Sequence, residues 1–277
     1  MAQFTTSDGL NLHYEDEGDG QPVLCLAGLT RNSMDFKFLM PFLSRKRVIR
    51  LDYRGRGNSD YDPEFMNYSI PREALDAVEL LDHLDIESAN LIGTSRGGLI
   101  AMVLACSNPD RLRGVVLNDI GPDIAAVGLE RIIEYVGKVP DFNDFDEAAE
   151  RLHTVYMKDF PDVPQSRWRL QAEMMWTQEE GGGLGLRYDA KLRDAMIAQA
   201  AAAPSPDLWP LFDELAKFPL AVIRGENSDL LSAETFVEMQ KRAPKMFAAT
   251  VPNRGHVPFL DEAEALTAIK WLLEETE

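Results

Sequence analysis

The sequence has few cysteines, few basic side chains and no long apolar run. Its only cysteines, Cys25 and Cys106, each lie within an apolar segment, which predicts two buried free thiols in a reducing compartment. No apolar stretch approaches the ~20 residues of a membrane span. Residues 1–9 lack the basic and apolar regions of a signal peptide. We therefore expect a cytoplasmic protein that does not bind membranes.

The charge balance also excludes several classes of partner. Lys and Arg number 28 against 46 Asp and Glu, a formal net charge of −18, and such a surface repels nucleic acid. The sequence contains no cluster with metal-ligand spacing, and no G-x-x-x-x-G-K-[ST] or G-x-G-x-x-G loop. We expect no metal and no cofactor, a small molecule as ligand, and either a monomer or a homodimer.

What the sequence does contain is the pentapeptide Gly93-Thr94-Ser95-Arg96-Gly97. Residues 89–92 before it read as a short buried strand, and residues 99–106 after it read as an apolar helix. A strand that turns into a helix at Ser95 would expose the hydroxyl and aim the first helical N–H groups at a developing anion. The alternative is a Gly/Ser-rich turn without chemistry, but the strand and the helix favour a nucleophile elbow.

A second loop could complete an anion-binding site. The apolar run 22–26 ends at Ala27-Gly28-Leu29, and Gly28 would let the backbone approach closely. We expect the N–H groups of Leu29 and Arg96 to form an oxyanion hole, which needs two donors. The alternative is an ordinary connection from a strand to a helix.

The order of elements predicts an α/β protein with a mostly parallel sheet. A weak hairpin spans residues 3–15. The expected inner strands are residues 22–26, 47–51, 89–92, 112–118, 219–223 and 247–251, and an amphipathic helix is expected at 72–84. Between residues 123 and 208 no strand-like run recurs, and four helical segments follow one another instead.

The loop at Ala27-Gly28-Leu29, the loop Asp52-x-Arg54-Gly55-x-Gly57-x-Ser59 and the Ser95 elbow follow one another as in the α/β-hydrolase superfamily. The sequence resembles its esterase, lactonase and C–C hydrolase branch. The resemblance implies an α/β-hydrolase fold, a mostly parallel twisted sheet flanked by helices, with a helical cap inserted after the sixth strand. The core would be residues 1–122 and 209–277, and the cap 123–208. One departure is Ala27-Gly28, where the family usually has His-Gly.

Two residues near the end of the chain complete a candidate catalytic triad. His256 and Asp229 each follow a predicted strand, so the chain order is Ser95, Asp229, His256, as in elbow hydrolases. His256 would accept the serine proton, and an acid would orient the imidazole. Asp229 is favoured by its place after the penultimate strand. Asp119, which also follows a strand, is the alternative acid, and Glu226 is a weaker one.

Candidate substrate contacts are harder to separate from packing. Arg31 and Arg96 lie beside the predicted site, where a guanidinium could bind a substrate carboxylate or a neighbouring acidic side chain. Gly28 would adjoin the substrate. Trp176 in the cap could line the pocket or pack the cap against the core, and the same holds for the other large apolar cap residues, Trp168, Met174 and Met175.

These residues predict a serine hydrolase that cleaves a small carboxylic ester or lactone through an acyl-enzyme. The alternative is a C–C bond hydrolase of meta-cleavage-type diketone acids, which would share the triad and the cap. A non-catalytic ligand receptor on the same scaffold is a third hypothesis. Ser95 in place of an aspartate argues against haloalkane dehalogenase and epoxide hydrolase chemistry, because those relatives use a carboxylate nucleophile.

Overall fold

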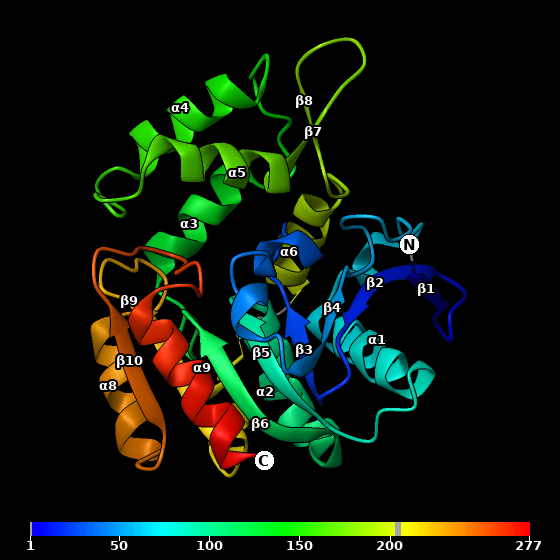
Figure 1. Ribbon diagram of the computed structural model, residues 1–277. Helices are drawn as coiled ribbons and strands as arrows, with labels where there is room; N and C mark the ends of the chain where they lie inside the picture. Colours follow the sequence, from blue (N-terminus) through cyan, green and yellow to red (C-terminus); the bar gives the residue numbers. More distant parts are fainter. Residues whose placement is uncertain (1, 203–205) are drawn as a thin grey trace.

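A twisted eight-stranded sheet forms the centre of the computed structural model, which describes residues 2–202 and 206–277 (Figure 1). The strand order is β1-β2-β4-β3-β5-β6-β9-β10; β2 runs antiparallel to β1 and β4, and the remaining pairs are parallel. The strands are β1 (Ala2–Thr5), β2 (Asn11–Glu17), β3 (Gln21–Leu26), β4 (Lys46–Leu51), β5 (Ala89–Thr94), β6 (Leu112–Asn118), β9 (Leu220–Gly225) and β10 (Phe247–Val251). The predicted mostly parallel sheet is confirmed.

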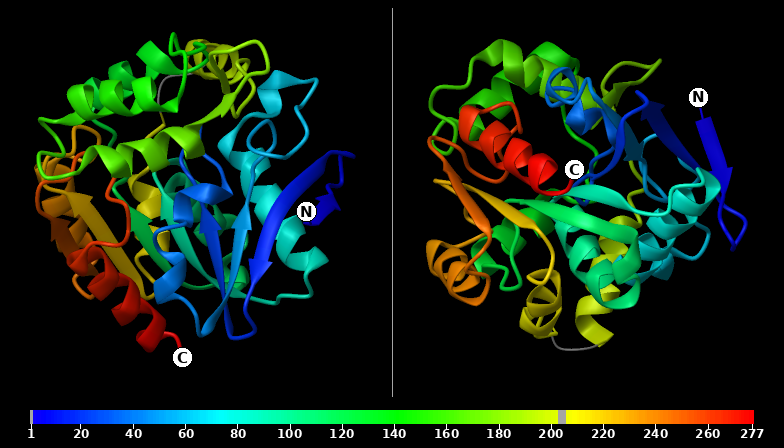
Figure 2. Two further views of the ribbon diagram at one scale, coloured as in Figure 1. Left: turned by 45° about the horizontal axis from the view of Figure 1, so that its top comes forward. Right: turned by 60° about the horizontal axis from the view of Figure 1, so that its bottom comes forward.

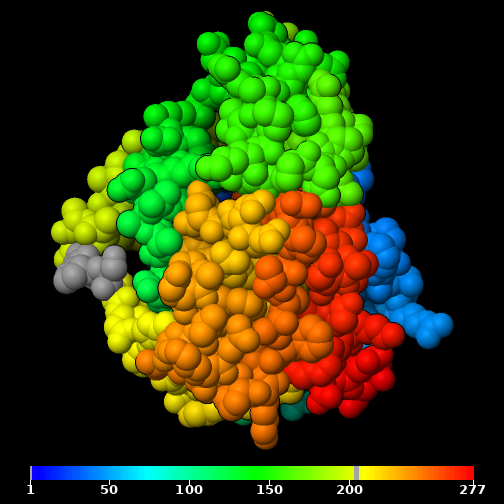
Figure 3. All heavy atoms as spheres, turned by 90° about the vertical axis from the view of Figure 1, so that its left-hand side faces the viewer, coloured from blue at the N-terminus to red at the C-terminus, as the bar shows by residue number. Residues whose placement is uncertain are grey.

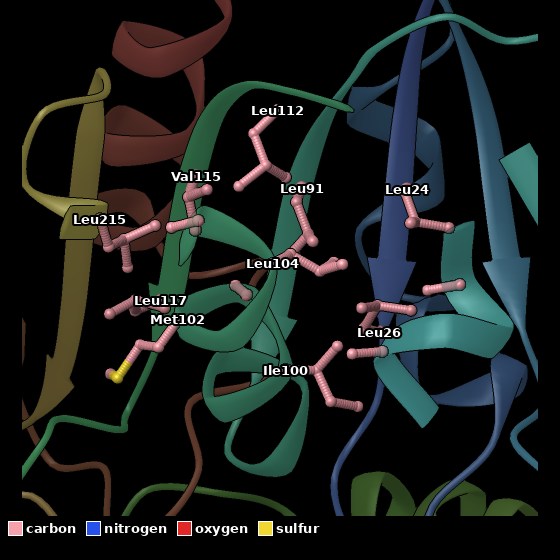
Figure 4. Close-up of a cluster of buried hydrophobic side chains, with 14 of the residues drawn as sticks. Leu24, Leu26, Leu91, Ile100, Met102, Leu104, Leu112, Val115, Leu117 and Leu215 are labelled. Carbon is pink, nitrogen blue, oxygen red and sulfur yellow. The ribbon is translucent and has the colours of Figure 1, made fainter. Parts of the chain in front are cut away.

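The inner strands are apolar on both sides because helices cover both faces of the sheet. The helices of the core are α1 (Ile70–His83), α2 (Arg96–Ser107), α7 (Trp209–Leu215), α8 (Ala233–Arg242) and α9 (Ala263–Glu275). Leu24 and Leu26 belong to a core cluster with side chains of α1, α2, α7 and α8, and Figure 4 shows part of this cluster. Val23 and Cys25, which alternate with them along β3, belong to a second cluster with α9, and α9 lies on the opposite face of the sheet (Figure 2, right).

Side-chain caps fix where two of these helices begin. Ser69 accepts a hydrogen bond from the N–H of Arg72 at the start of α1, where Pro71 lacks the N–H that would be unpaired. Ser232 accepts one from Thr235 at the start of α8. Residues 33–42 contain two 3₁₀ turns, Ser33–Phe36 and Met40–Phe42.

The segment between β6 and α7 lies above the carboxyl edge of the sheet (Figure 1). It contains α3 (Ala126–Tyr135), α4 (Phe145–Tyr156), α5 (Gln165–Met175) and α6 (Leu192–Ala202). The expectation of no strand here is wrong, because β7 (Trp176–Gln178) and β8 (Leu184–Leu186) pair as a short hairpin. Residues 203–205 of the expected cap lie outside the described residues, and the cap boundaries stay a prediction. In Figure 3 this segment, in green, rests on the orange and red part of the core.

Polar contacts attach this segment to the core. The Asn32 side chain donates to the Met174 carbonyl (3.0 Å), next to the loop after β3. The backbone of residues 187–189 bonds to the glycine-rich loop: Gly57 N–H donates to the Arg187 carbonyl, and Asp189 N–H donates to the Gly55 carbonyl, both at 2.8 Å. The glycine-rich loop at 52–59 therefore has a structural role, because its backbone hydrogen bonds hold residues 187–189 of this segment against the core.

One of the two thiol predictions is wrong. Cys25 is fully buried in β3, as expected, and burial raises the pKa of its thiol to about 12. Cys106 is exposed, because it lies in the last turn of α2 where the helix leaves the core. An apolar sequence neighbourhood did not reveal which side of this turn faces solvent.

Candidate active site

Ser95 occupies the turn between β5 and α2 with φ 51° and ψ −111°, in the region of positive φ that side chains rarely adopt. The flanking glycines make this turn possible. A Cβ atom on Gly97 would lie 2.1 Å from the Leu26 carbonyl oxygen, and one on Gly93 would lie 2.6 Å from the Gly97 backbone. The pentapeptide is therefore built as a nucleophile elbow, and its glycines are required by backbone contact.

Three side chains from separate strand ends form a hydrogen-bonded chain. The Ser95 Oγ lies 3.1 Å from Nε2 of His256, in the loop after β10. The other ring nitrogen, Nδ1, lies 2.7 Å from Oδ2 of Asp119, the residue that follows β6. With the proton on Nδ1, His256 donates to Asp119 and leaves Nε2 to accept the serine hydroxyl proton.

The structure places Asp119, the alternative acid, at His256, and it does not place Asp229 there as expected. Asp229 lies four positions beyond the last residue of β9, and its carboxylate forms an ion pair with Arg131 of α3 (2.9 Å). Asp119 comes directly after β6, beside β9 in the sheet, and is completely buried against His256. Glu226, the weaker alternative, directly follows β9 but accepts from the N–H of Asn253.

Two donors hold the Asp119 carboxylate in place. The N–H of Gly225 donates to Oδ1 (2.8 Å), and the Ser228 hydroxyl donates to Oδ2 (2.6 Å), the same oxygen that faces His256. Ser228 itself accepts from the N–H groups of Leu230 and Leu231. The sequence analysis missed Ser228, although it immediately precedes the aspartate that was expected to be the acid.

The predicted oxyanion-hole loop adjoins the elbow. The N–H of Gly97 donates to the Ala27 carbonyl (3.1 Å), and a Cβ on Gly28 would lie 3.9 Å from the Cβ of Ser95. Among the residues that the structure describes, the N–H groups of Leu29 and Arg96 have no hydrogen-bond acceptor. Both donors remain available to a bound anion, and their role in an oxyanion hole stays a prediction.

The two candidate arginines differ in their surroundings. The guanidinium of Arg96 pairs with buried Glu73 and donates to the Tyr68 carbonyl, so it does not line the cavity next to Ser95. The Arg31 side chain does line it; its Nε and Nη2 bind Asp35 (both 2.7 Å), and Nη2 also donates to Gln171 of α5 (2.6 Å). Bidentate binding of a substrate carboxylate by Arg31 is therefore excluded while Asp35 holds it.

A cavity of about 780 Å³ lies between the cap segment and the core and opens onto Ser95 and His256. Gly28 and Leu29 line its core side, and Trp176, Trp168 and Met175 line its cap side, whereas Met174 does not reach it. Sequence reasoning missed Tyr135 and Tyr156, which also line the cavity. A largely apolar cleft with few polar groups is typical of a small-molecule site.

Metal sites and membrane spans are both absent from the part of the chain that the structure describes. Across residues 2–202 and 206–277, no group of three or more His, Cys, Asp or Glu side chains is arranged to hold a metal ion. In the same residues, every helix is too short or too polar to cross a membrane.

Comparison with known proteins points to one family. The model of the alpha/beta hydrolase family matches residues 23–269. A 3-hydroxybutyrate-oligomer hydrolase of Cupriavidus necator is 34% identical over 91% of this chain and 88% of its own length. A 2-(acetamidomethylene)succinate hydrolase of Mesorhizobium japonicum is 30% identical over 89% of this chain and 85% of its own length.

Solved structures similar to this chain belong to the same family. A crystal structure of an alpha/beta hydrolase from Novosphingobium aromaticivorans superposes with a TM-score of 0.92 at 43% identity, covering 99% of this chain and 97% of that one. The structure of E-2-(acetamidomethylene)succinate hydrolase gives a TM-score of 0.81 at 27% identity, covering 99% of each chain. The nucleophile elbow, the eight-stranded sheet and these matches show that the chain is an enzyme of the alpha/beta hydrolase family.

Proposed function

We propose that this hydrolase cleaves a small carboxylic ester through an acyl-enzyme formed on Ser95. The observation that carries the proposal is the hydrogen-bonded chain from Ser95 Oγ through His256 to the buried Asp119. A serine hydroxyl is a weak nucleophile at neutral pH unless a base within hydrogen-bond reach accepts its proton. This arrangement supplies the base and orients it.

The proposed reaction has two halves. Ser95 Oγ attacks the ester carbonyl carbon while His256 Nε2 takes the hydroxyl proton, and the negative oxygen is stabilised by the N–H groups of Leu29 and Arg96. The intermediate collapses, the alcohol leaves with the proton from His256, and the acyl group stays on Ser95. Water then attacks the acyl-enzyme with His256 again as base, which releases the carboxylic acid and restores the hydroxyl.

The comparisons support an ester more than a C–C bond. The name of the Cupriavidus necator relative specifies oligomers of a hydroxy acid, and such oligomers are joined by ester bonds. The cavity, lined by apolar and aromatic side chains around Ser95, would hold an acyl chain of moderate length away from water. A lactone would be opened by the same steps, because its carbonyl presents the same electrophile.

Labelling by a fluorophosphonate probe, followed by peptide mapping, tests this proposal. A single adduct on Ser95 is expected, and Ser95→Ala should lose both the adduct and at least ~10³-fold of ester turnover. Ser107→Ala is the matched control, because Ser107 bonds only to the Val103 carbonyl at the far end of the same helix. Wild-type turnover by Ser95→Ala would overturn the proposal.

A side-by-side assay separates the ester from the C–C alternative. Turnover of a p-nitrophenyl butyrate ester and of a vinylogous diketone acid is compared with purified wild-type protein. We expect a higher kcat/KM on the ester. A higher kcat/KM on the diketone would overturn the ester proposal in favour of C–C bond hydrolysis. Binding of either compound without turnover, and without labelling of Ser95, would favour a receptor.

A further inference from the structure

Two hydrogen-bond donors of residues that line the cavity have no acceptor among the described residues. Arg31 uses Nε and Nη2 for Asp35 and Gln171, which leaves Nη1 unbonded. The hydroxyl of Tyr156, at the end of α4, likewise donates to no described acceptor within 3.5 Å, whereas the hydroxyl of Tyr135, at the end of α3, interacts with the Thr30 hydroxyl; both tyrosines line the cavity with Arg31. A cavity that offers donors without acceptors is suited to a ligand group rich in oxygen lone pairs.

The phenols stay protonated at neutral pH. Burial raises the pKa of Tyr156, and neighbouring Arg131 and Arg31 oppose the shift only in part. Desolvation and the neighbouring phenol of Tyr156 raise the pKa of Tyr135, while Arg31 and the Thr30 hydroxyl act in the opposite direction. Arg31, Tyr135 and Tyr156 all line the same cavity.

The charge of the cavity wall differs from that of the molecule. The chain carries a formal charge of −18, yet the wall has four basic side chains and two acidic ones. Arg31 pairs with Asp35, and Arg131 pairs with Asp159 and Asp229. Lys138 and Arg151 are exposed on the wall and have no acidic partner within 4.0 Å in the part of the chain that the structure describes. Exposed cations at a cleft raise the local concentration of anions.

We infer that Arg31 Nη1, with the Tyr135 and Tyr156 hydroxyls, binds a carboxylate of the substrate, so that the enzyme selects esters that carry a free carboxylate. One carboxylate oxygen would accept from Arg31 and the other from a tyrosine, since Asp35 leaves only one amino group of the guanidinium free. Lys138 and Arg151 would attract the anion toward the cavity. The inference deepens the proposed ester hydrolysis and rests on it.

Matched substrates test the inference with the full-length enzyme. Each pair consists of a carboxylate and its neutral carboxamide. The first pair is the p-nitrophenyl monoester of glutaric acid and the p-nitrophenyl ester of glutaramic acid. The second pair is 3-acetoxybutanoate and 3-acetoxybutanamide. The first pair places the charge in the acyl half and the second in the alcohol half. We expect the carboxylate to be preferred in kcat/KM by at least ~10-fold in one pair or both. Equal or better turnover of both carboxamides would overturn the inference.

Tyr156→Phe removes one hydroxyl and keeps the ring. In this variant the preference for the carboxylate should fall about 10-fold while the carboxamide keeps its kcat/KM, because only the charge-assisted hydrogen bond is lost. Tyr61→Phe is the control, since Tyr61 is 52% exposed and lies outside the cavity wall. An equal loss on both members of a pair would mean a packing role for Tyr156 and would contradict the inference.

Binding measured by calorimetry distinguishes a failure of the carboxylate site from a failure of the proposed reaction, because it needs no turnover. Ser95→Ala protein should bind the carboxylate member of the preferred pair at least ~10-fold more tightly than the carboxamide, and Tyr156→Phe in that background should remove most of the difference. If the wild-type enzyme turns over no ester and Ser95 is not labelled, the proposed reaction fails. If turnover is normal and neither measurement distinguishes carboxylate from carboxamide, the carboxylate site alone fails.

Discussion

The ends of β6 and β9 each present an aspartate at the same edge of the sheet, but only one of them reaches the histidine. Asp119, directly after β6, is completely buried and bonds to His256. Asp229, beyond β9, keeps 21% of its side chain exposed and pairs with Arg131 of the cap segment. The comparison shows that two aspartates after neighbouring strands have different partners: Asp119 faces the histidine, and Asp229 faces an arginine of the segment above the sheet.

The loop after β9 nevertheless contributes to the site through other atoms. Gly225 N–H and the Ser228 hydroxyl both donate to Asp119, so residues at the end of β9 hold the carboxylate that follows β6. The two strand ends therefore act together, because β6 supplies the charge and β9 supplies the hydrogen bonds that fix it.

The largest expected effect separates the two aspartates directly. Asp119→Asn should lower kcat by about 10⁴-fold, because an amide at this position favours the wrong tautomer of His256. Asp229→Asn should leave kcat within about threefold, as it removes only a partly exposed ion pair. Steady-state kinetics of the two variants on one ester checks this. A large loss in Asp229→Asn with normal activity in Asp119→Asn would make Asp229 the catalytic acid.

A smaller effect is expected when the hydrogen bond from Ser228 to Asp119 is removed. Ser228→Ala should lower kcat about 10-fold, since a hydrogen bond to a buried charge contributes ~1.5–3 kcal/mol. Without this donor the Asp119 charge stabilises the imidazolium more strongly, so the acidic limb of the kcat/KM profile should move to higher pH. Ser228→Thr, which keeps a hydroxyl, is the control. An unchanged pH profile in Ser228→Ala would mean that Ser228 acts on the loop alone.

The smallest effect is expected at the ion pair on the cap side. Arg131→Gln removes the contacts of α3 with both Asp159 and Asp229, and such partly exposed pairs each contribute ~0–1 kcal/mol. The free energy of unfolding should fall by no more than about 2 kcal/mol, and hydrogen exchange in α3 should become faster. Urea denaturation and exchange mass spectrometry measure the two. A loss above about 3 kcal/mol would show that this ion pair supports the fold as a whole.

Most of the fold could be predicted because its signals are local. Apolar runs marked the inner strands, and the glycines around Ser95 marked a turn where any Cβ would collide with backbone. The short β7–β8 hairpin was missed because three-residue strands carry too few residues to show a period. The exposure of Cys106 was missed because it depends on which side of α2 meets other helices.

The sequence by itself determined the elbow, the order of the strands along the chain and the types of side chain near the site, because these depend on residues close together in the chain. Only the tertiary structure decided that Asp119 rather than Asp229 meets His256, that Arg96 pairs with Glu73, and that Arg31 keeps one free amino group and lines a cavity with two tyrosines. Each of those outcomes depends on how strands and cap helices distant in sequence are placed beside one another, and small displacements decide which side chains come within hydrogen-bonding distance.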